Sequence, residues 1–286
     1  MKLVSFEHEG VEGVGILEAG ETRVSVLQAK DMLDVIGRGQ PEEVGSIPAV
    51  RTLDVRDIRL KAPLARPQRN IFCVGKNYRE HAREFARSGY EAGAVAGAEI
   101  DEYPAVFTKP WTSVIATGEQ VDLHPDVTSA VDYEGELGVV IGREGSHISK
   151  ESAFQHVWGY TIINDVTARD RQKNHKQWFL GKALDTFCPM GPWLVTADEV
   201  EATNLTLETY VNGELRQNAN TRDLIFDIPT LIATLSSGMR LMPGDIISTG
   251  TPAGVGIGMK PPRFLASGDI VEIRITGLGA LTNTFV

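Results

Sequence analysis

One stretch of the sequence decides the fold of this chain: Val131-Asp132-Tyr133-Glu134-Gly135-Glu136-Leu137-Gly138-Val139-Val140-Ile141-Gly142. Residues 137–141 are apolar throughout, which predicts a strand that is covered on both faces. Because side chains alternate along a strand, Glu134 and Glu136 share one face and enter the interior side by side. Adjacent buried carboxylates repel each other, and a divalent cation with oxygen ligands would relieve that cost. The alternative is a solvated strand end with two surface glutamates, and the spacing alone leaves both interpretations open.

The composition is typical of a globular protein. The chain has 286 residues, of which 42% are apolar and 23% are charged. A formal charge of −10 and a pI near 5.2 argue against nucleic acid and anionic membranes as partners. No apolar run approaches the roughly 20 residues of a membrane span, and the N-terminus turns acidic at Glu7, too early for a signal peptide. Cys73 and Cys188 form no CxxC pair, so we expect free, buried thiols in a cytoplasmic protein.

The chain divides at a segment that is rich in proline. Residues 1 to about 60 show the turn signals and alternation of a small β-rich unit, and nothing in them carries chemistry. The expected elements are strands at 3–7, 13–17 and 22–27 and a helix at 31–36. Pro63 and Pro67 keep the following segment extended. We therefore expect a small N-terminal domain over residues 1–66 and a catalytic domain over residues 67–286.

The catalytic domain opens with a buried strand and a helix. Residues 70–74 predict the strand, and residues 78–87 predict a helix that Asn77 caps. His81 and Glu84 are three residues apart, so they share one face of this helix. In isolation, a solvated surface face explains that pair best.

A second buried strand, at residues 159–163, leads to an acidic residue. Asp165 follows this strand, where a side chain can point into a cleft. Its alternative role is to cap the helical turn that comes next. Arg169 and Gln172 would lie on the same side as Asp165, and Lys109 stands before a proline-fixed turn.

The composition of three loops predicts their roles. Residues 91–102 are rich in alanine, glycine and acidic residues, which suits a mobile flap beside a site. Residues 181–192 have no periodicity and many turn formers, which is typical of an ordered loop lining a site. Residues 249–258 are rich in glycine, but they lack the phosphate-binding pattern, and Pro261 and Pro262 follow where a dinucleotide fold needs a helix. We expect this loop to approach a ligand with its backbone.

The C-terminal part continues with strands and one helix. Asn212-Gly213 lies between two strand patterns and predicts a type I′ hairpin. Asp227 and Pro229 begin an amphipathic helix, which Gly238 ends.

Several of these segments, taken in order, resemble motifs of the fumarylacetoacetate hydrolase family. The resemblance runs from about Asn70 to Val286. The motifs are Gly75-Lys76-Asn77-Tyr78-Arg79-Glu80-His81, Asp132-Tyr133-Glu134-Gly135-Glu136-Leu137, Asn164-Asp165-Val166-Thr167-Ala168-Arg169-Asp170, Gly181-Lys182, Asn212-Gly213-Glu214-Leu215-Arg216-Gln217 and Thr249-Gly250-Thr251-Pro252. The resemblance, closest to the acylpyruvate and fumarylpyruvate hydrolase branch, implies an α+β, mostly β fold. It also implies a mixed β-roll catalytic domain behind a small β-rich N-terminal domain, and a homodimer.

The resemblance also assigns roles to individual residues. The positions that bind Mg²⁺, or sometimes Mn²⁺ or Ca²⁺, are matched by Glu134, Glu136 and Asp165. The catalytic positions, a water-activating dyad on a lid segment and a lysine beside the metal, are matched by His81, Glu84 and Lys182. The positions that line the substrate pocket are matched by Lys109, Arg169, Gln172 and Thr251.

These roles make chemical sense together. Three carboxylates leave an octahedral Mg²⁺ about three open positions, which a 2-oxo acid can fill with its carboxylate and keto oxygens. The metal then stabilises the enolate that forms when a neighbouring bond breaks, and Lys182 adds positive charge there. His81, oriented by Glu84, can take a proton from water. Arg169 and Lys109 would bind substrate carboxylates.

The sequence therefore predicts a divalent-metal-dependent hydrolase of a C–C bond in an acylpyruvate or related β-diketo acid, fumarylpyruvate-like, as found in aromatic catabolism. The alternative is an oxaloacetate decarboxylase or keto–enol isomerase that forms the same enolate. Hydrolysis needs an activated water, and the presence of both His81 and Glu84 favours it. A non-catalytic binder of organic acids would be expected to lack the dyad or Lys182.

Overall fold

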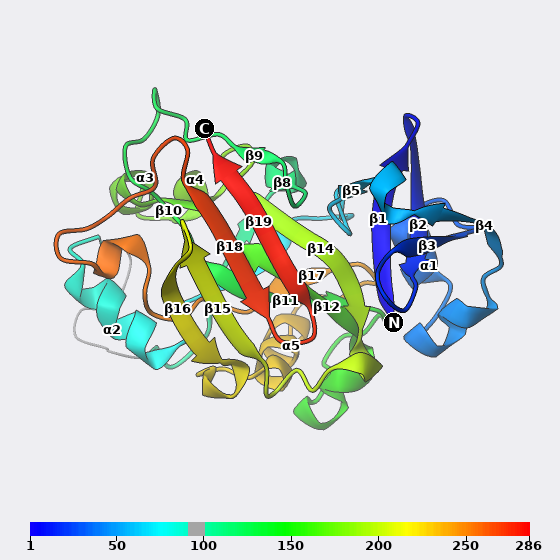
Figure 1. Ribbon diagram of the computed structural model, residues 1–286. Helices are drawn as coiled ribbons and strands as arrows, with labels where there is room; N and C mark the ends of the chain where they lie inside the picture. Colours follow the sequence, from blue (N-terminus) through cyan, green and yellow to red (C-terminus); the bar gives the residue numbers. More distant parts are fainter. Residues whose placement is uncertain (91–100) are drawn as a thin grey trace.

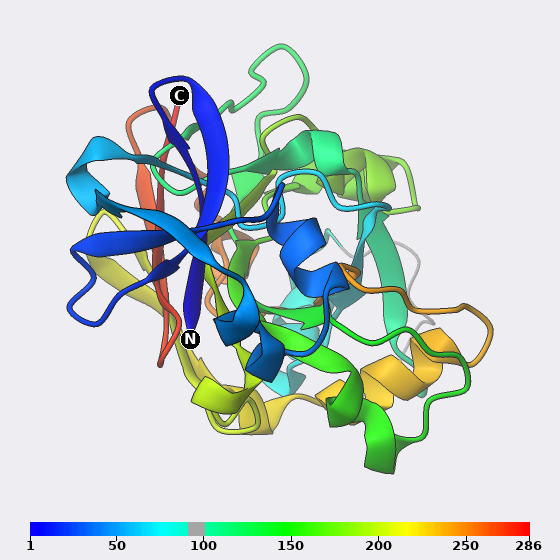
Figure 2. The ribbon, with the colours of Figure 1, turned by 90° about the vertical axis from the view of Figure 1, so that its right-hand side faces the viewer.

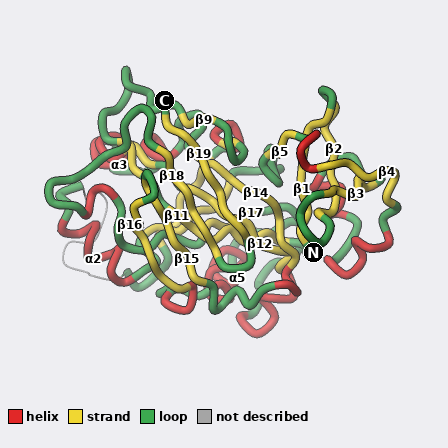
Figure 3. The backbone as a smooth tube through the Cα atoms, in the orientation of Figure 1, coloured by secondary structure: helices red, strands yellow, loops and turns green. Residues whose placement is uncertain are grey.

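Strands dominate the structure (Figure 3). The structure is a computed structural model and describes residues 1–90 and 101–286, so most of the flap predicted at 91–102 lies outside the described residues. The strands are β1 Lys2–His8, β2 Val11–Leu17, β3 Arg23–Leu27, β4 Ala49–Asp54, β5 Arg59–Lys61, β6 Ile71–Gly75, β7 Ala105–Lys109, β8 Val114–Ile115, β9 Gln120–Val121, β10 Val131–Asp132, β11 Gly135–Ile141, β12 Val157–Asn164, β13 Thr167–Ala168, β14 Cys188–Thr196, β15 Thr206–Val211, β16 Glu214–Asn220, β17 Ile246–Ser248, β18 Ile270–Ile275 and β19 Gly279–Phe285.

The helices are short. The α-helices are α1 Met32–Gly37, α2 Arg79–Arg87, α3 Arg169–Asn174, α4 Phe179–Lys182 and α5 Ile228–Ser236. The 3₁₀ helices are η1 Pro41–Ser46, η2 Val55–Asp57, η3 Trp111–Ser113, η4 Lys150–His156, η5 Ala197–Glu199, η6 Thr221–Asp223 and η7 Gly256–Gly258. Among the described helices, none is long and apolar enough to cross a membrane.

Two sheets stack over the middle of the molecule. In the described part of the chain, one sheet has the strand order β4-β3-β2-β1-β14-β12-β11-β17-β6-β7, with β5 paired to β1 and β8 paired to β14. The second sheet has the order β16-β15-β18-β19-β9, and it lies in front of β11, β12 and β17 in Figure 1. Strands β10 and β13 form a separate two-stranded sheet.

The hairpin of β11 and β12 sets the position of the acidic residues. The two strands are antiparallel, and Gly135 pairs with Asn164 at one end. Glu134 and Asp165 therefore become neighbours, and the Asp165 amide donates to the Glu134 carbonyl oxygen at 2.8 Å. In this way pairing brings together residues that are far apart in the sequence.

Strand β11 is covered on both faces, as its apolar sequence predicted. Leu137 and Val139 belong to a core that includes Ile273 of the second sheet. Val140, which points the opposite way, belongs to a second core with Leu3 and Met32 of the N-terminal segment. Successive side chains of β11 thus pack into two different cores, and this explains why an antiparallel strand has a continuous apolar run.

The N-terminal strands form a lobe at one side of the molecule, drawn in blue at the right of Figure 1 and facing the viewer in Figure 2. This lobe contains β1 to β5 and α1, close to the elements predicted there. Strand β1 pairs with β14 of the catalytic part, with Lys2 opposite Val195 and Leu3 opposite Leu194. One sheet therefore runs through both parts of the chain, and the division between residues 66 and 67 stays a prediction.

One local prediction and one alternative interpretation were wrong. Helix α2 begins after Tyr78, and Asn77 does not cap it, because its side chain instead binds backbone atoms of two distant loops. Asp165 does not cap α3 either, since Ala168 holds that position without a side-chain bond. Both side chains are thus free from local roles and serve tertiary contacts.

Other local predictions are confirmed. Asn212 and Gly213 have φ values of 53° and 79°, as a type I′ turn requires. Asp227 caps α5 by accepting from a backbone amide of its first turn. Cys73 and Cys188 are free and buried.

Candidate active site

Three buried carboxylates meet at the open end of the β11–β12 hairpin. Ligand oxygens of Glu134, Glu136 and Asp165 all lie within 4.8 Å of one another. At most 4% of each of these residues is exposed, so the alternative of solvated surface glutamates is wrong. Hard divalent cations bind such oxygen sets, and the donor set therefore fits a divalent metal ion.

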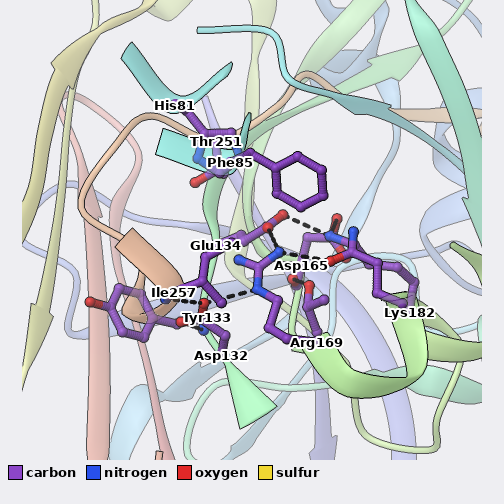
Figure 4. Close-up of polar contacts among 12 residues, drawn as sticks. His81, Phe85, Asp132, Tyr133, Glu134, Asp165, Arg169, Lys182, Thr251 and Ile257 are labelled. Carbon is purple, nitrogen blue, oxygen red and sulfur yellow. Dashed lines mark hydrogen bonds and ion pairs between the residues drawn. The ribbon is translucent and has the colours of Figure 1, made fainter. Parts of the chain in front are cut away.

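Three cations contact Glu134 and Asp165, and Figure 4 shows two of them, Lys182 and Arg169. The Lys182 ammonium donates to Glu134 Oε2 and to Asp165 Oδ2, both at 2.7 Å. The Lys109 ammonium donates to Asp165 Oδ1 at 2.6 Å, and Arg169 Nη1 lies 2.7 Å from Glu134 Oε1. Both oxygens of Glu134 and both oxygens of Asp165 are thus paired with protein cations, which holds these two carboxylates in fixed orientations.

Charge and burial act differently on the two glutamates. Burial disfavours an ionised Glu134, but Lys182 and Arg169 outweigh it and lower the pKa of Glu134 to about 2. Burial, together with the neighbouring carboxylates of Asp165 and Glu134, raises the pKa of Glu136 well above its usual value. Burial opposes the charge of Lys182, but the same two carboxylates raise its pKa. Glu136 is thus the carboxylate that most needs a proton or a bound cation.

Two side chains that the sequence did not single out as site residues hold this region in place. Ser248 Oγ donates to Glu136 Oε2 at 2.5 Å, and the Gly250 amide donates to the same oxygen at 3.0 Å. Gln217 accepts from the Gly135 amide at 3.0 Å and donates to Thr251 Oγ1 at 2.8 Å. Gln217 and Gly250 lay within quoted motifs, whereas Ser248 carried no signal beyond its position at the end of a strand.

His81 and Glu84 form a pair on α2 that faces inward. His81 Nδ1 lies 3.3 Å from Glu84 Oε2, and the two side chains are 5% and 16% exposed. The solvated surface face is therefore the wrong explanation of this pair. The Gly254 amide also donates to Glu84, at 3.1 and 3.3 Å from its two oxygens. A Cβ atom at Gly258 would lie 1.8 Å from Glu84 Oε1, so the carboxylate needs glycine there.

The loop at residues 249–258 uses its backbone amides to bind protein carboxylates. Asp132, which is fully buried, accepts from the amides of Gly256 at 2.7 Å and Ile257 at 3.1 Å. It also accepts from Arg169 Nε at 2.9 Å. The amides of Gly250 and Gly254 likewise donate to the carboxylates of Glu136 and Glu84. The approach of the loop's backbone to a ligand stays a prediction.

Glu134 and Glu136 line a small pocket of about 10 Å³, which is room for about one water molecule. The residues lining it come from both predicted and unpredicted positions: Val74, Gly75, Lys76, His81, Phe85, Phe107, Glu134, Glu136, Arg169, Gln172, Trp178, Lys182 and Thr251. Trp178 forms an aromatic wall, with its ring centroid 6.1 Å from that of Phe85 and 5.5 Å from that of Phe107. A larger pocket of about 350 Å³ lies in the N-terminal lobe, but Glu134 and Glu136 line the smaller one.

The predicted substrate residues fall into two groups. Arg169, Gln172 and Thr251 line the cavity, and Arg169 Nη2 has no hydrogen-bond partner among the described residues. Lys109 is fully buried and donates to Asp165 and to the Val166 carbonyl oxygen, so it contacts a carboxylate of the cluster and not the cavity. A direct contact of Lys109 with substrate stays a prediction.

The fold and this site define a class of enzyme: a β-roll protein in which three clustered carboxylates lie beside a lysine and a histidine–glutamate pair. The chain belongs to the fumarylacetoacetate hydrolase family, because residues 70–286 match the family described as Fumarylacetoacetate (FAA) hydrolase C-terminal. The resemblance seen in the sequence motifs and the mostly β fold class are thereby confirmed.

Individual relatives differ in the reaction named for them. The chain is 53% identical over 243 residues to the oxaloacetate tautomerase YisK of Bacillus subtilis, which covers 85% of this chain and 76% of that protein. A fumarylacetoacetate hydrolase from psychrophilic Exiguobacterium antarcticum is 42% identical with a TM-score of 0.85, covering 100% of this chain and 99% of that one. A 5-carboxymethyl-2-hydroxymuconate delta-isomerase from Mycobacterium smegmatis is 33% identical with a TM-score of 0.81, with the same coverage.

Proposed function

We propose that this protein interconverts the keto and enol forms of oxaloacetate or a closely related 2-oxo dicarboxylic acid, with a divalent metal ion. The observation that carries the proposal is the 53% identity to a protein named as an oxaloacetate tautomerase, over most of the chain. Hydrolysis of a C–C bond was the first prediction from the sequence, with isomerisation as its alternative. The named relatives favour that alternative.

The charge of the site suits a dianionic substrate. Four buried carboxylates, Asp132, Glu134, Glu136 and Asp165, lie among three cations. With every carboxylate ionised the cluster is negative, and a divalent ion makes it positive. An acidic protein can thus present a locally positive cavity to an organic dianion.

The chain's own residues supply the proton transfers. A bound divalent cation would polarise the 2-oxo group and make the neighbouring C3–H more acidic. Lys182 holds its ammonium 2.7 Å from Glu134 and Asp165, where it adds positive charge next to the developing enolate. His81 lines the cavity, and since Glu84 contacts its Nδ1, Nε2 is the ring nitrogen available to move a proton.

Hydrolysis remains the second candidate because of one observation. A histidine held by a carboxylate is also the arrangement that activates water. The same pair can therefore relay a proton within the substrate or take one from water. Product analysis separates these outcomes.

The test follows the enol absorbance of oxaloacetate together with its products. We expect rapid keto–enol equilibration with Mg²⁺ or Mn²⁺, its loss after chelation, and no more pyruvate than in the enzyme-free control. If an acylpyruvate is cleaved while oxaloacetate equilibrates at the uncatalysed rate, hydrolysis replaces tautomerisation. Rapid formation of pyruvate and carbon dioxide from oxaloacetate would indicate decarboxylation instead.

Three further predictions accompany this proposal. We propose Mg²⁺ as the metal, with Mn²⁺ or Ca²⁺ as substitutes. We also propose that the enzyme works in the cytoplasm and as a homodimer.

A further inference from the structure

Lys76 occupies an unusual position beside the cavity. It follows β6 directly, lines the cavity and has φ of +54°, a left-handed conformation that is uncommon for lysine. The next residue, Asn77, is fixed because its side chain donates to the Thr249 carbonyl oxygen at 2.7 Å and to the Phe226 carbonyl oxygen at 3.0 Å. Surrounding contacts thus impose the turn that carries Lys76, as is typical of strained residues at functional sites.

The ammonium of Lys76 is paired with a carboxylate outside the metal cluster. Its Nζ lies 2.7 Å from Asp101 Oδ2, and the two side chains are 9% and 21% exposed. The other cations that line the cavity, Lys182 and Arg169, bind carboxylates of the cluster, and only Arg169 Nη2 is left without a partner among the described residues of these two side chains. Lys76 therefore differs from them, because its present partner can leave without uncovering a metal ligand.

A 2-oxo dicarboxylate needs such a cation. One carboxylate and the 2-oxo group form the chelating end, and the second carboxylate is left inside a cavity with an aromatic wall. A carboxylate is costly there unless a charged donor binds it. We propose that Lys76 binds this second carboxylate, and that Asp101 occupies the same place until the substrate displaces it. This assignment rests on the proposed function and names the group that selects dicarboxylates.

If Lys76 binds the second carboxylate, substitutions of Lys76 and of Asp101 should change KM for oxaloacetate in opposite directions. Lys76→Met keeps the length of the side chain but removes the charge, so KM for oxaloacetate should rise about 10- to 100-fold. Asp101→Asn removes the competing charge at nearly constant shape, so KM should fall. In both variants kcat should change less than KM, since neither residue contacts the reacting atoms.

Oxalate provides the matched control. It has a chelating end and no remote carboxylate, so its inhibition constant should be the same in wild type and both variants. Lys76→Arg should restore much of the affinity for oxaloacetate. Calorimetric binding of oxaloacetate and oxalate gives the same comparison without turnover.

The outcomes are distinct. If both variants shift KM in the same direction, or if Lys76→Met weakens oxalate as much as oxaloacetate, the pair is a structural contact and the proposal is overturned. If wild type equilibrates oxaloacetate and Lys76→Met leaves its KM unchanged, only the role of Lys76 fails. If wild type lacks tautomerase activity altogether, the proposed function fails, and the binding measurements still decide what Lys76 recognises.

Discussion

Replacing Lys182 by methionine should separate metal binding from catalysis. Its ammonium, which is 2% exposed, is 2.7 Å from both Glu134 and Asp165, so its loss leaves two buried carboxylates without their shared cation. Removing one partner of a buried ion pair typically costs about 3–5 kcal/mol. We therefore expect the metal-free variant to lose several degrees in Tm. Because Lys182 repels a divalent ion at the same carboxylates, the variant should bind Mn²⁺ more tightly than wild type.

The same variant should be a poor catalyst. Without the ammonium next to the developing negative charge, turnover should fall about 10²- to 10³-fold, the usual effect of losing one such group. The assay combines calorimetric titration of Mn²⁺, thermal unfolding with and without Mn²⁺, and enol absorbance at saturating metal. Lys150→Met, at an exposed position, is the control and should behave like wild type. Weaker Mn²⁺ binding, or an apo Tm equal to wild type, would refute the idea that Lys182 and the metal compete for the same carboxylates.

Three other variants test the rest of the site. Glu136→Gln should abolish metal-dependent stabilisation and turnover while the fold stays intact by circular dichroism, and an unchanged thermal shift with Mn²⁺ would contradict its role as a ligand. Gly258→Ala should push the Glu84 carboxylate away, because the new Cβ would lie 1.8 Å from Glu84 Oε1. Turnover should fall about 10²-fold, within the range for general-base assistance, at unchanged metal affinity. Gly238→Ala, with open space around the new atom, is its control. Asp132→Asn should destabilise the protein by about 3 kcal/mol, since it breaks a buried charge pair, and a Tm equal to wild type in thermal unfolding would show that the pair is not needed.

Local sequence signals predicted the parts of this protein that depend on neighbouring residues. The apolar run of β11, the type I′ hairpin at Asn212 and the Asp227 cap each follow from short-range rules, and the structure confirms them. The alternation of a strand also placed Glu134 and Glu136 on one face. Their approach to Asp165 needed the pairing of β11 with β12, which no local pattern encodes.

The sequence alone determined which residue types stand at strand ends and helix faces, and its ordered motifs identified the family. Tertiary structure decided which charges meet. Asn77 and Asp165 looked like helix caps because each precedes a helix, yet both are drawn into contacts with distant segments. Likewise, Lys109 is distant from Asp165 along the chain but donates to it at 2.6 Å. The physical reason is that an unpaired buried charge costs far more free energy than an uncapped helix end. The contacts available in the packed interior, and not local helix preferences, therefore determine which group pairs with each charged side chain.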